Sequence, residues 1–288
     1  MAGQQDFDNN VKPNWCPGCG DYAVLNSLRR AVANVGIEPH NLAVVSGIGC
    51  SGRFSGYMYA YGFHSIHGRS LPVAQGIKLA NRDLTVVACG GDGDGYAIGI
   101  GHTIHAIRRN LDITYIVMDN HIYGLTKGQT SPRSDLGFKT KTSPTGSIET
   151  PVSVLAMALA AGATFVAQGY SRDLDELTAL IEQGIQHNGF SLINIFSPCV
   201  TFNKVNTYEW FSDHLIGVKS IEGYDSGSRA IAMENIIAHD GLLTGLLYQD
   251  KSKASYQDLL HGYDKKPLSH TGLKLSQEDF ERLTAEFY

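Results

Sequence analysis

The chain has 288 residues, of which 43% are hydrophobic and 18% are charged, and its formal net charge is −5. This composition is typical of a globular protein with one large or two small domains, and the lack of a basic excess argues against nucleic acid as the main partner. Residues 1–10 show no signal peptide and no apolar run approaches the roughly 20 residues that span a bilayer, so we expect a cytoplasmic protein without a membrane partner.

Amphipathic helices and short apolar strands alternate along the first 200 residues. Asp21 is expected to cap a helix that ends at Gly36, and Ser70 and Pro72 are expected to begin the next helix. Further helices are predicted at residues 97–109, 150–161 and 174–185. Short apolar runs predict strands at residues 42–46, 84–89, 113–119, 164–168 and 191–197. We therefore predict an α/β fold with a doubly wound, mostly parallel sheet that helices cover on both faces.

Two segments depart from this alternation and suggest how the chain is divided. Residues 120–149 form a connection rich in Gly, Ser, Thr and Pro, and a connection of that length inside a compact domain is usually functional. The C-terminal part loses the alternation and ends in one clear helix, for which Ser276 and Asp279 provide a capping box. We expect three parts, namely residues 1–14 as an N-terminal arm, 15–200 as the main ligand-binding domain and 201–288 as an extension that covers the domain or contacts another subunit.

The glycine-rich turn GGDGDG follows the strand predicted at residues 84–89, and it carries Asp92 in its first turn. Asn120 follows the next predicted strand, so both side chains should lie at the edge of the sheet where ligands bind. Carboxylate and amide oxygens suit Mg²⁺, and the glycines allow a phosphate to approach the backbone. The pattern predicts a Mg²⁺-bridged diphosphate site, to which the carbonyl of Ile122 could add a third protein ligand. The alternative is an ordinary glycine-rich turn with a capping aspartate.

The sequence GIGCSG at residues 47–52 matches the pattern GxGxxG, which invites a dinucleotide-binding interpretation. About 20 residues further on, however, the acidic residue that should meet the ribose is missing, and the sequence reads IHGRS. The residues after the glycines also form a poor helix. We therefore do not predict a nicotinamide-binding site.

Five cysteines are present, and they do not suggest a disulfide framework in a reducing compartment. Cys16, Cys19, Cys50 and Cys199 form a set of four soft ligands that suits either tetrahedral Zn²⁺ or a [4Fe–4S] cluster. Spacing alone does not choose between them, although single remote cysteines slightly favour iron–sulfur. Cys89 ends a predicted strand and is expected to be a packed thiol.

The chain contains five distinctive motifs, which are, in chain order, NWCPGCGDY, GIGCSGR, HGRSLPVAQG, GGDGDGYAIG and DNHIYGLTKGQTSP. Over about residues 12–205 the chain resembles the β subunit of the 2-oxoacid:ferredoxin oxidoreductases in the order and the spacing of these motifs. The local resemblance is closest to bacterial 2-oxoglutarate:ferredoxin oxidoreductase β chains, in YIVMDNHIYGLTKGQTSP and FSPCVTFNKVNTYEW.

The resemblance implies thiamine diphosphate with Mg²⁺ and one [4Fe–4S] cluster. It places the cluster on the four cysteines at positions 16, 19, 50 and 199, and Mg²⁺ on Asp92, Asn120 and the carbonyl of Ile122. The residues expected to contact thiamine diphosphate are Ile48, Gly49, Ser51, His67, Gly91, Asp92, Gly93, Asp94, Asn120, Tyr123, Gly124, Leu125 and Thr126.

Basic residues near these motifs are candidates for binding the substrate or coenzyme A. By resemblance His67 is expected near the thiamine ring or the substrate carboxylate, with a catalytic role. Arg53, Lys127 and Arg133 could bind a substrate carboxylate or the phosphates of coenzyme A. Lys139 and Lys141 are expected to face solvent or to contact ferredoxin.

The resemblance implies CoA-dependent oxidative decarboxylation of a 2-oxoacid, with electrons passed to ferredoxin. We expect 2-oxoglutarate as substrate and succinyl-CoA as product, with pyruvate or a broad range of 2-oxoacids as the alternative. The chain has a single sheet domain and no candidate for the glutamate that activates thiamine, so we expect an α subunit to supply both that glutamate and the rest of the pocket. The expected assembly is αβ or its dimer. Interpretations from other classes are a non-oxidative thiamine enzyme with structural zinc and a binding module without activity.

Overall fold

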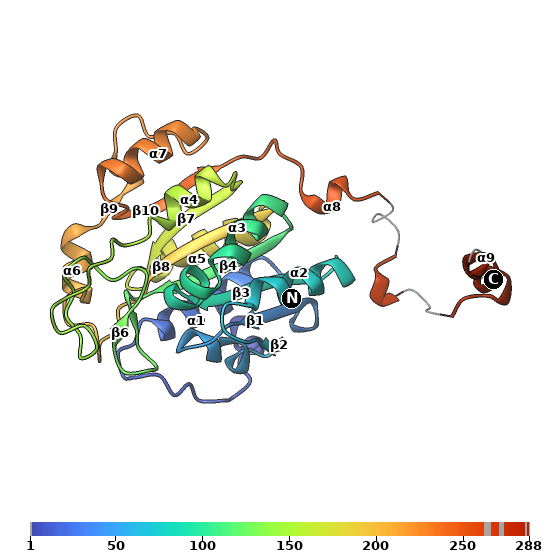
Figure 1. The fold of residues 1–288 in the computed structure, drawn as a ribbon, viewed down its shortest axis with the longest axis horizontal. Coiled ribbons are helices and arrows are strands. Elements are labelled where there is room, and N and C mark those ends of the chain that lie inside the picture. The colour runs from blue at the N-terminus through green and yellow to red at the C-terminus, as the bar shows by residue number, and fades with distance from the viewer. Residues whose placement is uncertain (1, 262–265, 271–273, 286, 288) are drawn as a thin grey trace.

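The structure, a computed structural model, describes residues 2–261, 266–270, 274–285 and 287. Its centre is an eight-stranded sheet in the order β2-β1-β3-β4-β8-β7-β10-β9 (Figure 1). Neighbouring strands are parallel except for the antiparallel pair β7 and β10. The strands of this sheet are β1 (Leu42–Ser46), β2 (Tyr61–His64), β3 (Thr85–Gly91), β4 (Ile113–Asp119), β7 (Phe165–Tyr170), β8 (Phe190–Phe196), β9 (Ile216–Gly217) and β10 (Leu243–Gln249).

A separate two-stranded hairpin lies in the long connection, formed by β5 (Ile122–Tyr123) and β6 (Gln129–Thr130). The described helices are α1 (Asp21–Asn34), α2 (Ser70–Ala80), α3 (Ile100–Arg109), α4 (Val154–Ala160), α5 (Leu174–Gln186), α6 (Tyr208–His214), α7 (Arg229–Ala238), α8 (Tyr256–Leu259) and α9 (Gln277–Thr284). Among the described residues, no helix combines the length and apolar character needed to cross a membrane.

Helices pack on both faces of the sheet, and each face has its own apolar core. On one face, α1 and α5 bury Leu28 and Ile181 against the strands. On the other face, α2, α3, α4 and α7 contribute side chains such as Ile107 and Leu155. Strands β1, β4 and β8 are buried along their whole length because both of their faces are covered. The predicted α/β fold with a doubly wound, mostly parallel sheet is confirmed.

Several predicted boundaries are displaced. The cap assigned to Asp21 is wrong: Gly20 is the N-cap of α1, and the carboxylate of Asp21 accepts a hydrogen bond from Ser197 Oγ at 2.8 Å. The helix predicted from residue 97 begins at Ile100, because a π-helical turn, Asp94–Ile98, precedes it. The helix predicted from residue 150 begins at Val154.

Strands β2, β9 and β10 were not predicted. All four residues of β2 are exposed, so this edge strand shows no buried apolar run. Strands β9 and β10 come from the segment predicted to be the C-terminal extension, and they complete the far edge of the sheet. The helix predicted at the C-terminal end is confirmed as α9, whose Ser276 Oγ accepts from the backbone N–H of Asp279 at 3.0 Å.

Candidate active site

A cavity of about 280 Å³ opens at the carboxyl ends of β1, β3 and β4. Every residue that the sequence predicts to contact thiamine diphosphate lines it, together with Ile122 and Cys50. Ligands of open α/β sheets bind at this edge because the loops that follow neighbouring strands meet there. The structure therefore brings the candidate residues together, although they come from four separate segments of the chain.

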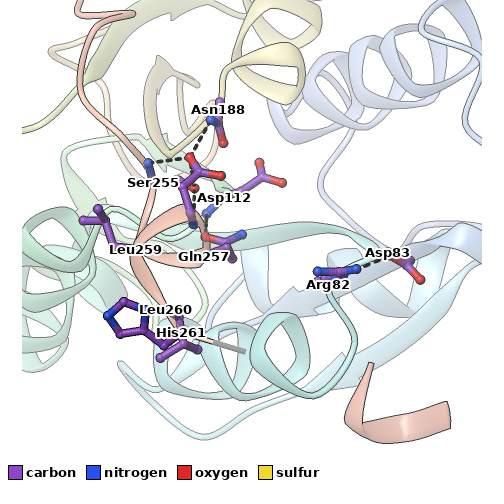
Figure 2. Close-up of a pocket in the computed structure, with 10 residues that line it drawn as sticks. Arg82, Asp83, Asp112, Asn188, Ser255, Gln257, Leu259, Leu260 and His261 are labelled. Atoms are coloured by element: carbon purple, nitrogen blue, oxygen red, sulfur yellow. Dashed lines mark hydrogen bonds and ion pairs between the residues drawn. The ribbon is translucent and has the colours of Figure 1, made fainter. Parts of the chain in front are cut away.

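A larger cavity, of about 940 Å³, lies at the opposite edge of the sheet (Figure 2). Its polar groups are used to fasten the C-terminal segment: Asn188 Nδ2 donates to Asp258 at 2.9 Å, and the N–H of Asp112 donates to Gln257 Oε1 at 3.1 Å. Volume does not identify the site here, because the glycine turns and the buried acids lie at the smaller cavity.

Asp92 lies directly after β3 and is 2% exposed. Its Oδ2 accepts a hydrogen bond from Ser131 Oγ at 2.5 Å. Burial, and next the charge of Asp119, raises the pKa of Asp92 to about 8. Within the described part of the chain no basic side chain forms an ion pair with Asp92, because Arg133 pairs with Asp119 instead, with Nε 2.9 Å from Oδ2. A bound cation would stabilise this buried carboxylate.

Asp94, two residues further on, connects its own turn to two other loops by hydrogen bonds. Its Oδ1 accepts from the backbone N–H groups of Ile48 at 3.0 Å and Gly68 at 2.8 Å. Its Oδ2 is buried and has no hydrogen-bond partner among the described residues. The same atom lies 1.8 Å from the place where a side chain on Gly47 would begin, so glycine is required there. Burial raises the pKa of Asp94, and an unpartnered carboxylate oxygen beside the cavity fits a polar ligand.

The turn after β4 carries the other predicted metal ligands. The pairing of Gly91 with Met118 sets Asp92 and Asn120 on adjacent strand ends. Asn120 Oδ1 accepts from the N–H of Ile122 at 3.0 Å, which leaves a second lone pair on that oxygen. Tyr123 joins the two turns, because its hydroxyl donates to the carbonyl of Gly93 at 3.1 Å. One carboxylate, one amide and one carbonyl oxygen at one cavity form a donor set suited to Mg²⁺.

Two of the four cysteines, Cys50 and Cys199, lie beside this cavity. A side chain on Gly124, which lines the cavity, would begin 3.4 Å from Cys199 Sγ and 3.7 Å from Cys50 Sγ. Burial raises the pKa of the Cys50 thiol to about 12, with further contributions from Asp21, Cys199 and Cys16. Among the described residues, no group of three or more His, Cys, Asp or Glu side chains is arranged to hold a metal ion. The thiols of Cys19, Cys50 and Cys199 influence one another electrostatically, but the described residues do not bring the four cysteines into one metal-binding arrangement, so the cluster stays a prediction.

Cys89 is fully buried in β3, as expected of a packed thiol.

The predicted basic residues divide into two groups. His67 lines the cavity with Nε2 3.7 Å from Asp94 Oδ1, while Arg53 and Lys127 are exposed. Arg133 is wrong as a candidate for substrate or coenzyme A, because its buried guanidinium binds Asp119 and the carbonyl of Val152. The remaining two, Lys139 and Lys141, are exposed as predicted.

Sequence reasoning missed several residues of the site. Asp21 lines the cavity, and burial raises its pKa to about 6. Asn203 donates from Nδ2 to the backbone carbonyl of Asn120 at 3.1 Å. Ser131 reaches the turn after β3 from the long connection. No local pattern marks these residues, since each contact joins positions far apart in the chain.

Comparison with families of known proteins first shows the class of protein to which the chain belongs. Residues 47–195 match the family described as thiamine pyrophosphate enzyme, C-terminal TPP binding domain. Residues 199–265 match a second family, which describes the C-terminal part of the pyruvate ferredoxin oxidoreductase beta chain. The fold and the cavity thus define the thiamine diphosphate-binding domain of a thiamine-dependent enzyme.

Individual relatives narrow this class. The chain is 40% identical over 289 residues to 2-oxoacid:ferredoxin oxidoreductase 2, subunit beta, of Aeropyrum pernix, covering 96% of this chain and 94% of the relative. It is 46% identical over 199 residues to the 2-oxoglutarate oxidoreductase subunit KorB of Mycobacterium tuberculosis, covering 69% of this chain and 53% of the relative. A solved 2-oxoglutarate:ferredoxin oxidoreductase from Magnetococcus marinus superposes with a TM-score of 0.89 at 38% identity, covering 98% of this chain and 96% of that chain.

The chain belongs to the family of 2-oxoacid:ferredoxin oxidoreductase beta subunits, as the motifs indicated. It is a subunit of a thiamine diphosphate-dependent oxidoreductase, and a beta subunit implies an alpha partner.

Proposed function

We propose that this chain, with its alpha partner, catalyses the CoA-dependent oxidative decarboxylation of 2-oxoglutarate to succinyl-CoA and passes the electrons through a [4Fe–4S] cluster to ferredoxin. The observation that carries the proposal is the position of Gly124, which lines the thiamine cavity and lies beside the sulfur atoms of Cys50 and Cys199. A cluster on these sulfurs would be adjacent to the cofactor. Electrons would then have a short path out of the site.

Within the proposal, each part of the cavity has a stated role. Asp92, Asn120 and the carbonyl of Ile122 hold Mg²⁺, and the thirteen predicted residues lining the cavity bind thiamine diphosphate. Asp94 fixes the loops of Ile48 and Gly68 around the cofactor. When bound, thiamine diphosphate supplies the electron sink that allows CO₂ to leave the 2-oxoacid.

A role of His67 near the reacting atoms is supported by its position, because it lines the cavity with Nε2 3.7 Å from Asp94 Oδ1. No glutamate is among the residues that line this cavity in the described part of the chain, which supports a partner-supplied glutamate. Helix α9 of the C-terminal extension also suits assembly with a partner, because its Phe280 and Leu283 are about half exposed.

The substrate is proposed from the relatives. KorB subunits are named for 2-oxoglutarate, and the Magnetococcus marinus enzyme was solved with 2-oxoglutarate, coenzyme A and succinyl-CoA bound. Pyruvate is the second candidate, because the family matched by residues 199–265 is named for it.

An activity assay tests this proposal. The complex purified anaerobically with its alpha chain is expected to reduce ferredoxin with 2-oxoglutarate and coenzyme A, and to turn over pyruvate more slowly. Omission of coenzyme A is the control. Faster reduction of ferredoxin with pyruvate would favour the second substrate. If none of the 2-oxoacids tested supported ferredoxin reduction, the chain would instead be a binding module without activity.

The cluster has a separate test in the metal content. The complex is expected to be brown and to carry about four iron atoms per beta chain. Cys199→Ser is expected to lose most of the iron, whereas Cys89→Ala, at a buried cysteine outside the proposed set, should retain it. One zinc atom and no colour would instead support a structural zinc site.

A further inference from the structure

Residues 131–134 of the long connection contact both turns that carry the proposed metal ligands. Ser131 reaches the turn after β3, where its hydroxyl meets Asp92, 39 residues away in the chain. Ser134 reaches the turn after β4, where its hydroxyl donates to the carbonyl of His121 at 2.6 Å. Both serines are buried. We call residues 131–134 the serine bracket.

The direction of each hydroxyl is fixed by a second hydrogen bond. Ser131 Oγ accepts from the backbone N–H of Arg133 at 3.2 Å, so its single proton is available for Asp92 Oδ2. Ser134 Oγ accepts from the backbone N–H of Ser131 at 2.9 Å, so its proton is available for His121. In return, the N–H of Ser134 donates to the carbonyl of Ser131 at 3.1 Å. The two serines therefore hold each other in the orientation that serves the two turns.

The bracket is itself anchored. The guanidinium of Arg133 donates to Asp119 Oδ2 at 2.9 Å and to the carbonyl of Val152 at 2.7 Å, and both side chains of this ion pair are buried. The turn after β4 needs support, because His121 has a φ of +58°, a left-handed conformation that is unfavourable for a non-glycine residue. Such a conformation persists only where surrounding contacts enforce it.

We propose that the serine bracket positions the Mg²⁺ site of this enzyme, an inference that rests on the proposed function of Asp92 and Asn120. Ser131 donates a hydrogen bond to Oδ2 of Asp92 and thereby orients the carboxylate so that Oδ1 is available to the metal. Ser134 fixes His121, and with it the spacing between Asn120 and the carbonyl of Ile122. Neither serine touches the metal; both are positioning residues.

The test is a titration of the thiamine-free complex with Mg²⁺ at a fixed concentration of thiamine diphosphate, with cofactor binding followed by equilibrium dialysis. Ser131→Ala is expected to raise the Mg²⁺ concentration at half-saturation about 10- to 100-fold, the range seen when a partner of a metal ligand is removed. Ser134→Ala should raise it in the same direction. Ser131→Thr, which keeps a hydroxyl, should restore most of the binding.

Ser143→Ala is the matched control, because this serine belongs to the same connection and is only partly buried. Its half-saturation should equal that of the natural protein. A role in folding alone would lower the unfolding midpoint of Ser131→Ala without shifting the Mg²⁺ titration of the folded complex, and that result would overturn the proposal. If the natural complex bound thiamine diphosphate without Mg²⁺, the metal assignment itself would be wrong, and the bracket with it.

Discussion

Replacement of Asp92 by alanine is expected to lower the affinity of the complex for thiamine diphosphate by roughly 100-fold or more, since a direct ligand should matter at least as much as its hydrogen-bonded partners. Asp92 is buried at the end of β3 and is the carboxylate of the proposed metal site. Alanine removes the negative charge that draws the cation into the cavity. The iron content should not change, because the cysteines of the proposed cluster are separate residues.

Equilibrium dialysis with thiamine diphosphate and Mg²⁺ measures this effect, and iron analysis of the same sample provides the internal control. Asp92→Asn should be intermediate, because an amide keeps one oxygen ligand while it loses the charge. Normal cofactor binding by Asp92→Ala would show that the metal is held elsewhere. A simultaneous loss of iron would indicate general disruption of the cavity.

The parts of the site that could be predicted from the sequence lie at strand ends. Strands β1 and β4 are short continuous apolar runs, and they occupy the predicted ranges because both faces of the sheet are covered. Once the strands are placed, Asp92 and Asn120 necessarily follow neighbouring carboxyl ends. The register of β3 on β4 then brings them to one cavity.

The residues that could not be predicted act over long distances in the chain. Ser131 meets Asp92 because the connection folds back across the sheet edge, and nothing in its local sequence encodes that path. Strand β10 was missed for a related reason: its apolar run joins the sheet antiparallel to β7, outside the alternation of strands and helices. Arg133 was misassigned because a basic residue in a loop is usually exposed, whereas tertiary structure buries this one against Asp119.

Arg133→Met is expected to have the largest effect on stability, lowering the free energy of unfolding by about 3–5 kcal/mol. Asp119 has no exposed surface, and its carboxylate would be left in the core without its cationic partner. Burial raises the pKa of Asp119, but the charges of Arg133 and His121 outweigh burial and lower that pKa overall. Removal of Arg133 would therefore leave a buried carboxylate that is costly in either protonation state.

Guanidinium unfolding of the full chain measures this loss, with Arg53→Met as the matched control. Arg53 is exposed, so the same chemical change there should alter stability by no more than about 0.5 kcal/mol. Adding Asp119→Asn to Arg133→Met should recover part of the lost stability, because no charge then remains uncompensated. Equal effects of Arg133→Met and Arg53→Met would mean that the ion pair contributes nothing, and that the end of β4 is held by the hydrogen bond from Asn194 Nδ2 to Asp119 instead.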